Sequence, residues 1–127
     1  MEAVAAEIGE KALAIPTNCL EKDSILAARE VVRKQFGKVD ILINNAGVLD
    51  EGLKAIDSFT DDDMNKVIDI NTKGTMCMTR EVAVEMAKTG YGSIVNVASV
   101  AGVMGCGGAA YVASKAAIIG ITRHTAL

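Results

Sequence analysis

The stretch VDILINNAG, residues 39–47, contains the clearest strand signal in this chain. Its first five residues are a run of mostly β-branched and aliphatic side chains, with Gly37 before it and the polar turn NNAG after it. A short apolar run bounded by turn residues is typical of a strand buried on both faces, as in parallel sheets. We therefore expect a buried strand at 39–43.

Helical patterns alternate with strand patterns on both sides of this stretch. Thr60 followed by three aspartates is a strong helix start, because the hydroxyl caps the first turn and Asp63 closes a capping box. Helices are expected at 2–8, 23–36, from 60 to about 88 and 111–126, and further strands at 12–16 and 93–97. This alternation predicts right-handed crossovers and a doubly wound parallel sheet with helices on both faces, an α/β fold with three strands.

Length and composition agree with a single domain over residues 1–127. Half of the residues are hydrophobic and only 3% are aromatic, so the core must be aliphatic. The net charge of −3 argues against nucleic acid or an anionic membrane as partner. Three scattered cysteines form neither a zinc motif nor a disulfide framework. Together with the lack of a signal peptide or a long apolar run, this predicts a cytoplasmic protein.

A glycine-rich loop precedes the last helix and reads G-x-G-x-x-A at Gly105, Gly107 and Ala110. It matches the loose form of a dinucleotide-binding fingerprint. Such a fingerprint needs an acidic residue about 20 positions further on, at the end of the next strand. Only 17 residues follow Ala110, and they form one helix pattern. We therefore interpret the loop as a flexible border of a site and not as a phosphate cradle.

Tyr111 and Lys115 are four residues apart in the last predicted helix and so share one face. A nearby ammonium favours the phenolate form of a tyrosine, which then exchanges a proton with a carbonyl or alcohol oxygen more readily. Ser99, at the end of the preceding strand, is placed to hydrogen-bond the same oxygen. Taken alone the pair is common, and a solvated helix start is the simpler interpretation.

Four motifs, in this order along the chain, make the catalytic interpretation of Tyr111 and Lys115 the stronger one. They are Asn44-Asn45-Ala46-Gly47, Asn71 in VIDINTKG, SIVNVAS ending at Ser99, and Tyr111-Val-Ala-Ser-Lys115. Together they resemble the short-chain dehydrogenase/reductase family from one end of the chain to the other. The resemblance implies a partial Rossmann-like fold and an NAD- or NADP-dependent oxidoreductase, which transfers hydride between the cofactor and a small-molecule carbonyl or secondary alcohol.

The resemblance also implies residue roles. Tyr111 resembles the family's acid/base, Lys115 the residue that assists it and holds the nicotinamide ribose, and Ser99 the group that steadies the reacting oxygen. Asn71 resembles a mid-helix residue whose local distortion positions a proton relay, and an Asn followed by Gly74 does disfavour a regular helix interior.

Cofactor contacts follow in the same way. Asn45, Ala46 and Gly47 resemble the segment that lines the adenosine side, and Asn18 and Cys19 the pair that meets the adenine. The family often has Asp where this chain has Asn18.

The resemblance covers about half of a family member, without the N-terminal glycine-rich segment or the C-terminal substrate segment. The spacing from Ser99 to Tyr111 is one residue shorter than usual for the family. Two hypotheses therefore stay open. One is the dehydrogenase described above, inactive if the absent segments are essential. The other is a non-enzymatic module that associates, as family members do, through the helices at 60–88 and 111–126, which also predict a homo-oligomer.

Overall fold

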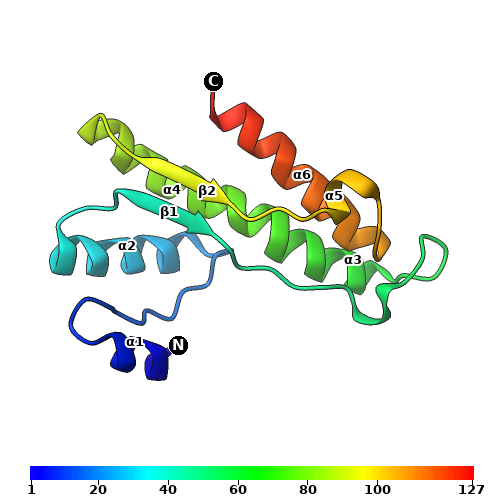
Figure 1. The fold of residues 1–127 in the computed structure, drawn as a ribbon, viewed down its shortest axis with the longest axis horizontal. Helices are drawn as coiled ribbons and strands as arrows, with labels where there is room; N and C mark the ends of the chain where they lie inside the picture. The colour runs from blue at the N-terminus through cyan, green and yellow to red at the C-terminus, as the bar shows by residue number, and fades with distance from the viewer.

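The computed structural model describes all of residues 1–127. The fold has two strands and six α-helices (Figure 1). The helices are α1 (Glu2–Ile8), α2 (Lys22–Phe36), α3 (Asp61–Ile68), α4 (Gly74–Thr89), α5 (Ala101–Met104) and α6 (Ala109–Thr125). The strands are β1 (Ile41–Asn44) and β2 (Ser93–Asn96). A short 3-10 helix, η1 (Glu51–Leu53), and a π-helical segment, η2 (Asp69–Lys73), complete the elements. No helix combines the length and the apolar character needed to cross a membrane.

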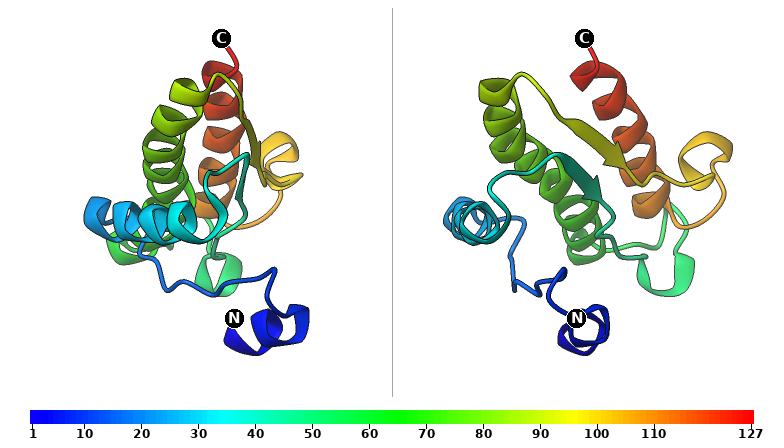
Figure 2. Two further views of the ribbon diagram at one scale, coloured as in Figure 1. Left: turned by 90° about the vertical axis from the view of Figure 1, so that its left-hand side faces the viewer. Right: turned by 60° about the vertical axis from the view of Figure 1, so that its left-hand side comes forward.

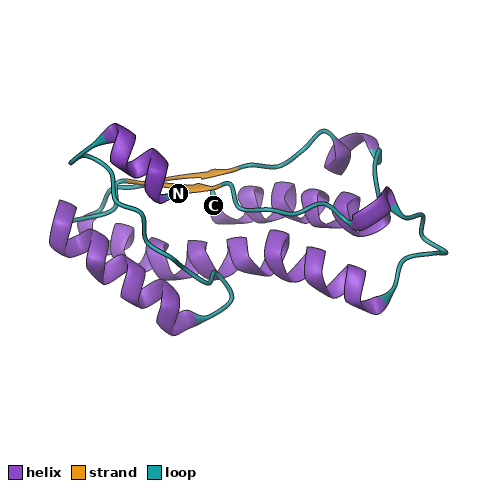
Figure 3. Ribbon diagram, turned by 90° about the horizontal axis from the view of Figure 1, so that it is seen from below, coloured by secondary structure: helices purple, strands orange, loops and turns teal.

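The two strands are parallel, so the predicted α/β fold with a parallel sheet is confirmed. Their register pairs Leu42 with Ile94 and Asn44 with Asn96. Leu42 packs with Val82 and Met86 of α4 in the centre of the core. The views from the side and from below show α4 running along the pair of strands (Figures 2 and 3). The core thus lies between β1 and α4, and the carboxyl ends of both strands lead toward α5, α6 and α3.

The strand predicted at 12–16 is wrong. This segment forms no strand, and Ala12 donates its amide hydrogen to the carbonyl of Gly9 in a local turn. It runs with α1 apart from the two paired strands (Figure 1). The aliphatic pattern favours an extended backbone, but a ladder also needs an adjacent strand, and the sheet of this chain contains only β1 and β2.

The helix predicted from Thr60 to about Lys88 is present as α3, η2 and α4, which follow one another without a break. Thr60 and Asp63 form the expected capping box, with Thr60 Oγ1 accepting from the Asp63 amide and Asp63 accepting from the Thr60 amide. Gly90 ends α4 in the left-handed conformation, with φ of 68°. Only the π-helical segment was not expected in detail, although the sequence pointed to an interruption at Asn71.

Asp63 makes the stability of this helix start depend on acid. A hydrogen bond from Lys54 Nζ, at 2.6 Å, and then bonds from the Thr60 amide and hydroxyl lower the pKa of Asp63 to about 2. Because the pKa of Asp63 in the folded chain lies below its unfolded value, the stability that its carboxylate contributes is present at neutral pH and is lost as pH falls from about 4 to about 2.

The Asp63→Asn variant should therefore lose less stability than the wild type over this pH range, as measured by urea unfolding. Equal pH slopes for the two proteins would contradict the assignment.

Candidate active site

Asn71 is the residue that joins the loop after β1 to helix α6. It is 1% exposed and lies within η2. Its Oδ1 accepts from the Val48 amide at 2.7 Å, and its Nδ2 donates to the Val48 carbonyl at 2.9 Å and to Ser114 Oγ at 3.0 Å. All three contacts are made by one side chain, so the positions of the loop and of α6 relative to each other depend on it.

The π-helical turn explains how a residue inside a long helix comes to serve this junction. A π-turn inserts one extra residue into the helix and commonly marks a functional position. Here the Gly74 amide donates to the carbonyl of Asp69, and the Thr75 hydroxyl donates to the main-chain carbonyl of Asn71 at 2.8 Å. Asn71 therefore presents its side chain toward α6 while its own carbonyl is held by the following turn.

Lys115 lies close to Tyr111, as their spacing predicts. Lys115 is 6% exposed, its Nζ donates to the Val97 carbonyl at 2.9 Å, and it lies 5.7 Å from the centroid of the Tyr111 ring. Gly47 packs against both Lys115 and Asn71, because a Cβ on Gly47 would lie 3.3 Å from Asn71 Oδ1 and 3.5 Å from Lys115 Nζ. The structure thus brings Gly47, Asn71 and Lys115 together from three distant parts of the sequence.

Ser99 lies beyond the end of β2, immediately before α5. Its Oγ accepts a hydrogen bond from the Ala101 amide at 3.2 Å and so supports the start of α5. The hydroxyl groups of Ser99 and Tyr111 make no hydrogen bond to each other. Both side chains are only partly buried. The Ser99 hydroxyl is therefore held at the start of α5 and makes no hydrogen bond to Tyr111.

Helix α5 was not expected from the sequence, and it packs closely on α6. A Cβ on Gly102 would lie 2.5–2.7 Å from backbone atoms of Lys115 and Ala116. Backbone atoms in a helix cannot move aside as a flexible side chain can.

Gly102→Ala should therefore destabilise the fold by about 1–3 kcal/mol, as overpacking does, and displace Lys115. Gly120→Ala is the matched control, because a Cβ on Gly120 of α6 meets nothing within 4 Å. Thermal unfolding of both variants tests this, and a Gly102→Ala protein as stable as the wild type would contradict the close packing.

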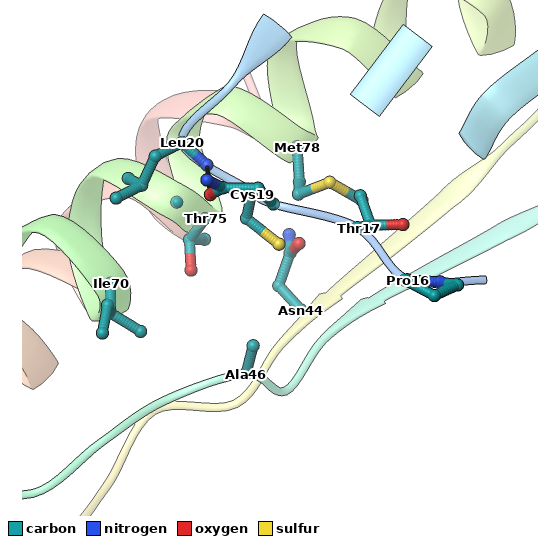
Figure 4. Close-up of a pocket in the computed structure, with 11 residues that line it drawn as sticks. Pro16, Thr17, Cys19, Leu20, Asn44, Ala46, Ile70, Thr75 and Met78 are labelled. Carbon is teal, nitrogen blue, oxygen red and sulfur yellow. Dashed lines mark hydrogen bonds between the residues drawn. The ribbon is translucent and has the colours of Figure 1, made fainter. Parts of the chain in front are cut away.

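A cavity of about 610 Å³ opens beside the carboxyl end of β1 (Figure 4). Its lining combines apolar and polar side chains from the loop before α2, the end of β1, η2 and α4: Pro16, Thr17, Asn18, Cys19, Leu20, Asn44, Ala46, Ile70, Gly74, Thr75 and Met78. Of the predicted cofactor contacts, Asn18, Cys19 and Ala46 line this cavity. Asn45 is exposed outside it, and Gly47 lies against Asn71 and Lys115 instead.

Asn18 and Cys19, in the loop before α2, have different surroundings. The Asn18 side chain donates to Glu21 Oε1 at 2.8 Å and accepts from the Leu20 amide at 3.0 Å, so it stabilises the turn that leads into α2. Burial, and secondarily the nearby Cys77, raises the pKa of the Cys19 thiol. A thiol of this kind stays protonated at neutral pH and acts as a wall of the cavity.

Ser114 is a site residue that the sequence reasoning missed. It is fully buried, its Oγ donates to the Tyr111 carbonyl at 2.8 Å, and it accepts from Asn71 Nδ2. Its position next to Lys115, on the helix that carries Tyr111, could have pointed to it, because a small polar residue fits where α6 packs against η2.

The glycine-rich loop connects α5 to α6. Gly105 ends α5 with φ of 69°, Gly107 has φ of 124°, and Gly108 is the N-cap of α6. The glycines at 105 and 107 are therefore required by backbone geometry, which accounts for the pattern without a phosphate.

Comparison with known proteins agrees with these motifs. The family described as short chain dehydrogenase matches residues 1–127. Nodulation protein G of a Rhizobium species is 35% identical over 127 residues, covering 99% of this chain and 51% of that protein. The 3-oxoacyl-(acyl-carrier-protein) reductase FabG of Staphylococcus epidermidis is 37% identical over 129 residues, covering 98% and 52%.

Among solved structures, a crystal structure of NAD⁺-bound xylitol dehydrogenase is similar, with a TM-score of 0.87 and 34% sequence identity. The match covers 98% of this chain and 49% of that one. The chain thus spans about half the length of the relatives it matches. The family match over the whole chain, together with the geometry around Asn71, Tyr111 and Lys115, leads to one conclusion: the chain belongs to the short chain dehydrogenase family.

Proposed function

We propose that this chain forms the catalytic part of an NAD(P)-dependent oxidoreductase that acts on a carbonyl compound or a secondary alcohol. The observation that carries the proposal is the convergence of Lys115, Tyr111 and Asn71 beside the loop that contains Gly47. The NAD⁺-bound neighbour supports a nicotinamide cofactor, and either NAD or NADP is compatible with the residues present.

The cavity beside β1 fits the adenosine part of such a cofactor. Its walls include the apolar side chains of Leu20, Ile70 and Met78, which suit a flat aromatic base. The carboxamide of Asn44, from β1, and the hydroxyl of Thr75, from α4, add polar groups to the lining. Asn18, Cys19 and Ala46 would contact this end, Asn45 and Gly47 would continue toward the reacting end, and Tyr111 and Lys115 would hold the nicotinamide ribose.

The bound cofactor supplies or accepts the hydride, and the chain's own residues manage the proton. Tyr111 donates a proton to the carbonyl oxygen in reduction and removes it from the alcohol in oxidation. The ammonium of Lys115, held by the Val97 carbonyl, places a positive charge beside the ring of Tyr111. Ser99 donates a hydrogen bond to the same substrate oxygen, and Asn71 keeps α6 in register with the loop after β1.

Self-association is a further part of this proposal. The outer faces of α4 and α6 form a shallow groove with exposed Met76 and with Gly120, Ile121 and His124. Together with the family resemblance, this groove supports our proposal of a homo-oligomer through the helices at 60–88 and 111–126. The alternative, an association module without catalysis, predicts the same contact and is separated from the enzyme by cofactor binding.

Calorimetric titration of NADH and NADPH into the folded chain tests the proposed function. Micromolar binding of one of them, abolished by Ala46→Phe in the cavity wall, is the expected result. Ala87→Phe is the matched control, because Ala87 is exposed near the far end of α4. Absence of heat with both nucleotides at millimolar concentration would contradict cofactor binding by this chain and favour the association module.

A further inference from the structure

The N-terminus of α6 is capped by a segment from another part of the chain. Gly108, the N-cap residue, has no side chain to accept from the amides of the first turn. The Lys54 carbonyl accepts from the Ala109 amide at 3.2 Å, and Asp50 Oδ2 accepts from the Tyr111 amide at 3.5 Å. Residues 50–54 therefore provide the capping groups that the helix itself lacks.

Asp50 occupies an environment that is unusual for a carboxylate. It is 4% exposed, and its Oδ1 has no hydrogen-bond partner. A buried carboxylate is costly unless charge or hydrogen bonds compensate it, and the positive end of a 17-residue helix supplies both. The carboxylate also presses against Gly108, where any Cβ would collide with it. Because Gly108 has no side chain, the Asp50 carboxylate can pack directly against its backbone.

The same segment reaches the start of α3. Lys54 Nζ binds Asp63 Oδ2 at 2.6 Å, within the capping box at Thr60. Residues 50–54 consequently link the first turns of both helical rods in the site, the α3–η2–α4 rod that carries Asn71 and the α6 helix that carries Tyr111. Since the segment follows directly on the loop that Asn71 binds at Val48, it connects the two rods at a second point.

We propose that Asp50 is a positioning residue, which holds the first turn of α6 and thereby the backbone of Tyr111 in place relative to Asn71. Its catalytic consequence rests on the proposed function of Tyr111. Asp50 acts through Tyr111 and not on substrate, because its Oδ1 is buried away from solvent. It is also not part of a metal site, as no group of three or more His, Cys, Asp or Glu side chains is arranged to hold an ion.

Hydrogen exchange of individual amides tests the cap without any assay of activity. Asp50→Ala should raise the exchange of the amides at 109–112 by about tenfold, the usual effect of losing a capping group, while the amides of α4 keep their protection. Asp50→Asn keeps an acceptor and loses only the charge, so a rise of about two- to fivefold is expected. Glu51→Ala is the control, because Glu51 is exposed in the same segment. Unchanged exchange at Tyr111 in Asp50→Ala would overturn the proposal.

A second variant tests the cap by changing Gly108, the residue that Asp50 packs against. Gly108→Ala leaves Asp50 in the sequence and displaces its carboxylate, so it should reproduce the exchange pattern of Asp50→Ala, whereas Gly120→Ala in the same helix should not. If Asp50→Ala fails to fold, Asp50→Asn and Gly108→Ala decide the matter. A first turn that stays fully protected in both would refute the cap.

Steady-state kinetics then shows whether Asp50 positions Tyr111 for catalysis or only stabilises the fold. Asp50→Ala should lower kcat by about tenfold or more, with the KM for the cofactor nearly unchanged, and Asp50→Asn should recover most of kcat. An unchanged kcat together with a loosened first turn would overturn the positioning role. A wild-type protein without turnover would count against the proposed function, while the exchange result would still decide the capping role.

Discussion

Replacing Tyr111 by Phe is expected to reduce NAD(P)H-linked carbonyl reduction by about 10²–10⁴-fold, the usual contribution of a positioned general acid. Phe keeps the ring and its contact with Lys115, 5.7 Å from the ring centroid, and loses only the hydroxyl. The fold and the affinity for the cofactor should therefore change little. Initial rates of cofactor oxidation at saturating substrate measure the effect, with circular dichroism as a check on folding.

The chain contains its own control for this experiment. Tyr91, the only other tyrosine, also lies 5.7 Å from a lysine ammonium, that of Lys38, but it is 63% exposed and follows the end of α4. Tyr91→Phe should leave the rate unchanged. A Tyr111→Phe protein that keeps more than half of the wild-type rate would remove Tyr111 from the proposed mechanism and direct attention to another proton donor.

Asn71→Leu is expected to produce the largest loss of stability in the chain, about 3–5 kcal/mol. The substitution leaves the amide and the carbonyl of Val48 without their partner, and Ser114 keeps only its bond to the Tyr111 carbonyl. Each unsatisfied group away from solvent costs about 1–3 kcal/mol. A loss of this size is a large part of the total stability of a domain, about 5–15 kcal/mol. Urea unfolding, followed by circular dichroism, measures the difference.

Asn65→Leu is the matched control for Asn71→Leu. Asn65 belongs to the same rod of helices but is exposed on α3, so the change should stay within about 0.5 kcal/mol. Activity should fall with Asn71→Leu as well, because α6 loses its link to the loop after β1. A loss of stability below about 1 kcal/mol would show that the buried groups find other partners and would contradict the role of Asn71 as the junction.

Much of the local structure was predictable because its causes are local. The capping box at Thr60 and Asp63, the end of α2 at Gly37 and the strand around 41–44 depend on residues within one or two turns of each other. The proximity of Tyr111 and Lys115 follows in the same way from their spacing in one helix. The interruption at Asn71 could be located, because Asn and Gly weaken a regular helix, but its π-helical form could not.

The features that escaped prediction all depend on partners far away in the sequence. Residues 12–16 have the pattern of a strand and form none, since the sheet offers them no neighbour. Helix α5 exists where Gly102 can approach the backbone of α6. Ser114 and Asp50 looked like ordinary polar residues until the fold placed one between Asn71 and Tyr111 and the other at the N-terminus of α6.

The class of fold, the family resemblance and the helix that carries Tyr111 and Lys115 can thus be predicted from the amino-acid sequence, because periodicity, caps and short motifs are properties of neighbouring residues. The pairing of the strands, the contacts of Asn71 with two parts of the chain, and the carboxylate at the N-terminus of α6 become visible in the folded structure alone. Those outcomes depend on contacts between residues 23 to 61 positions apart, as between Asn71 and Val48 or between Tyr111 and Asp50, which chain folding alone brings within hydrogen-bonding distance.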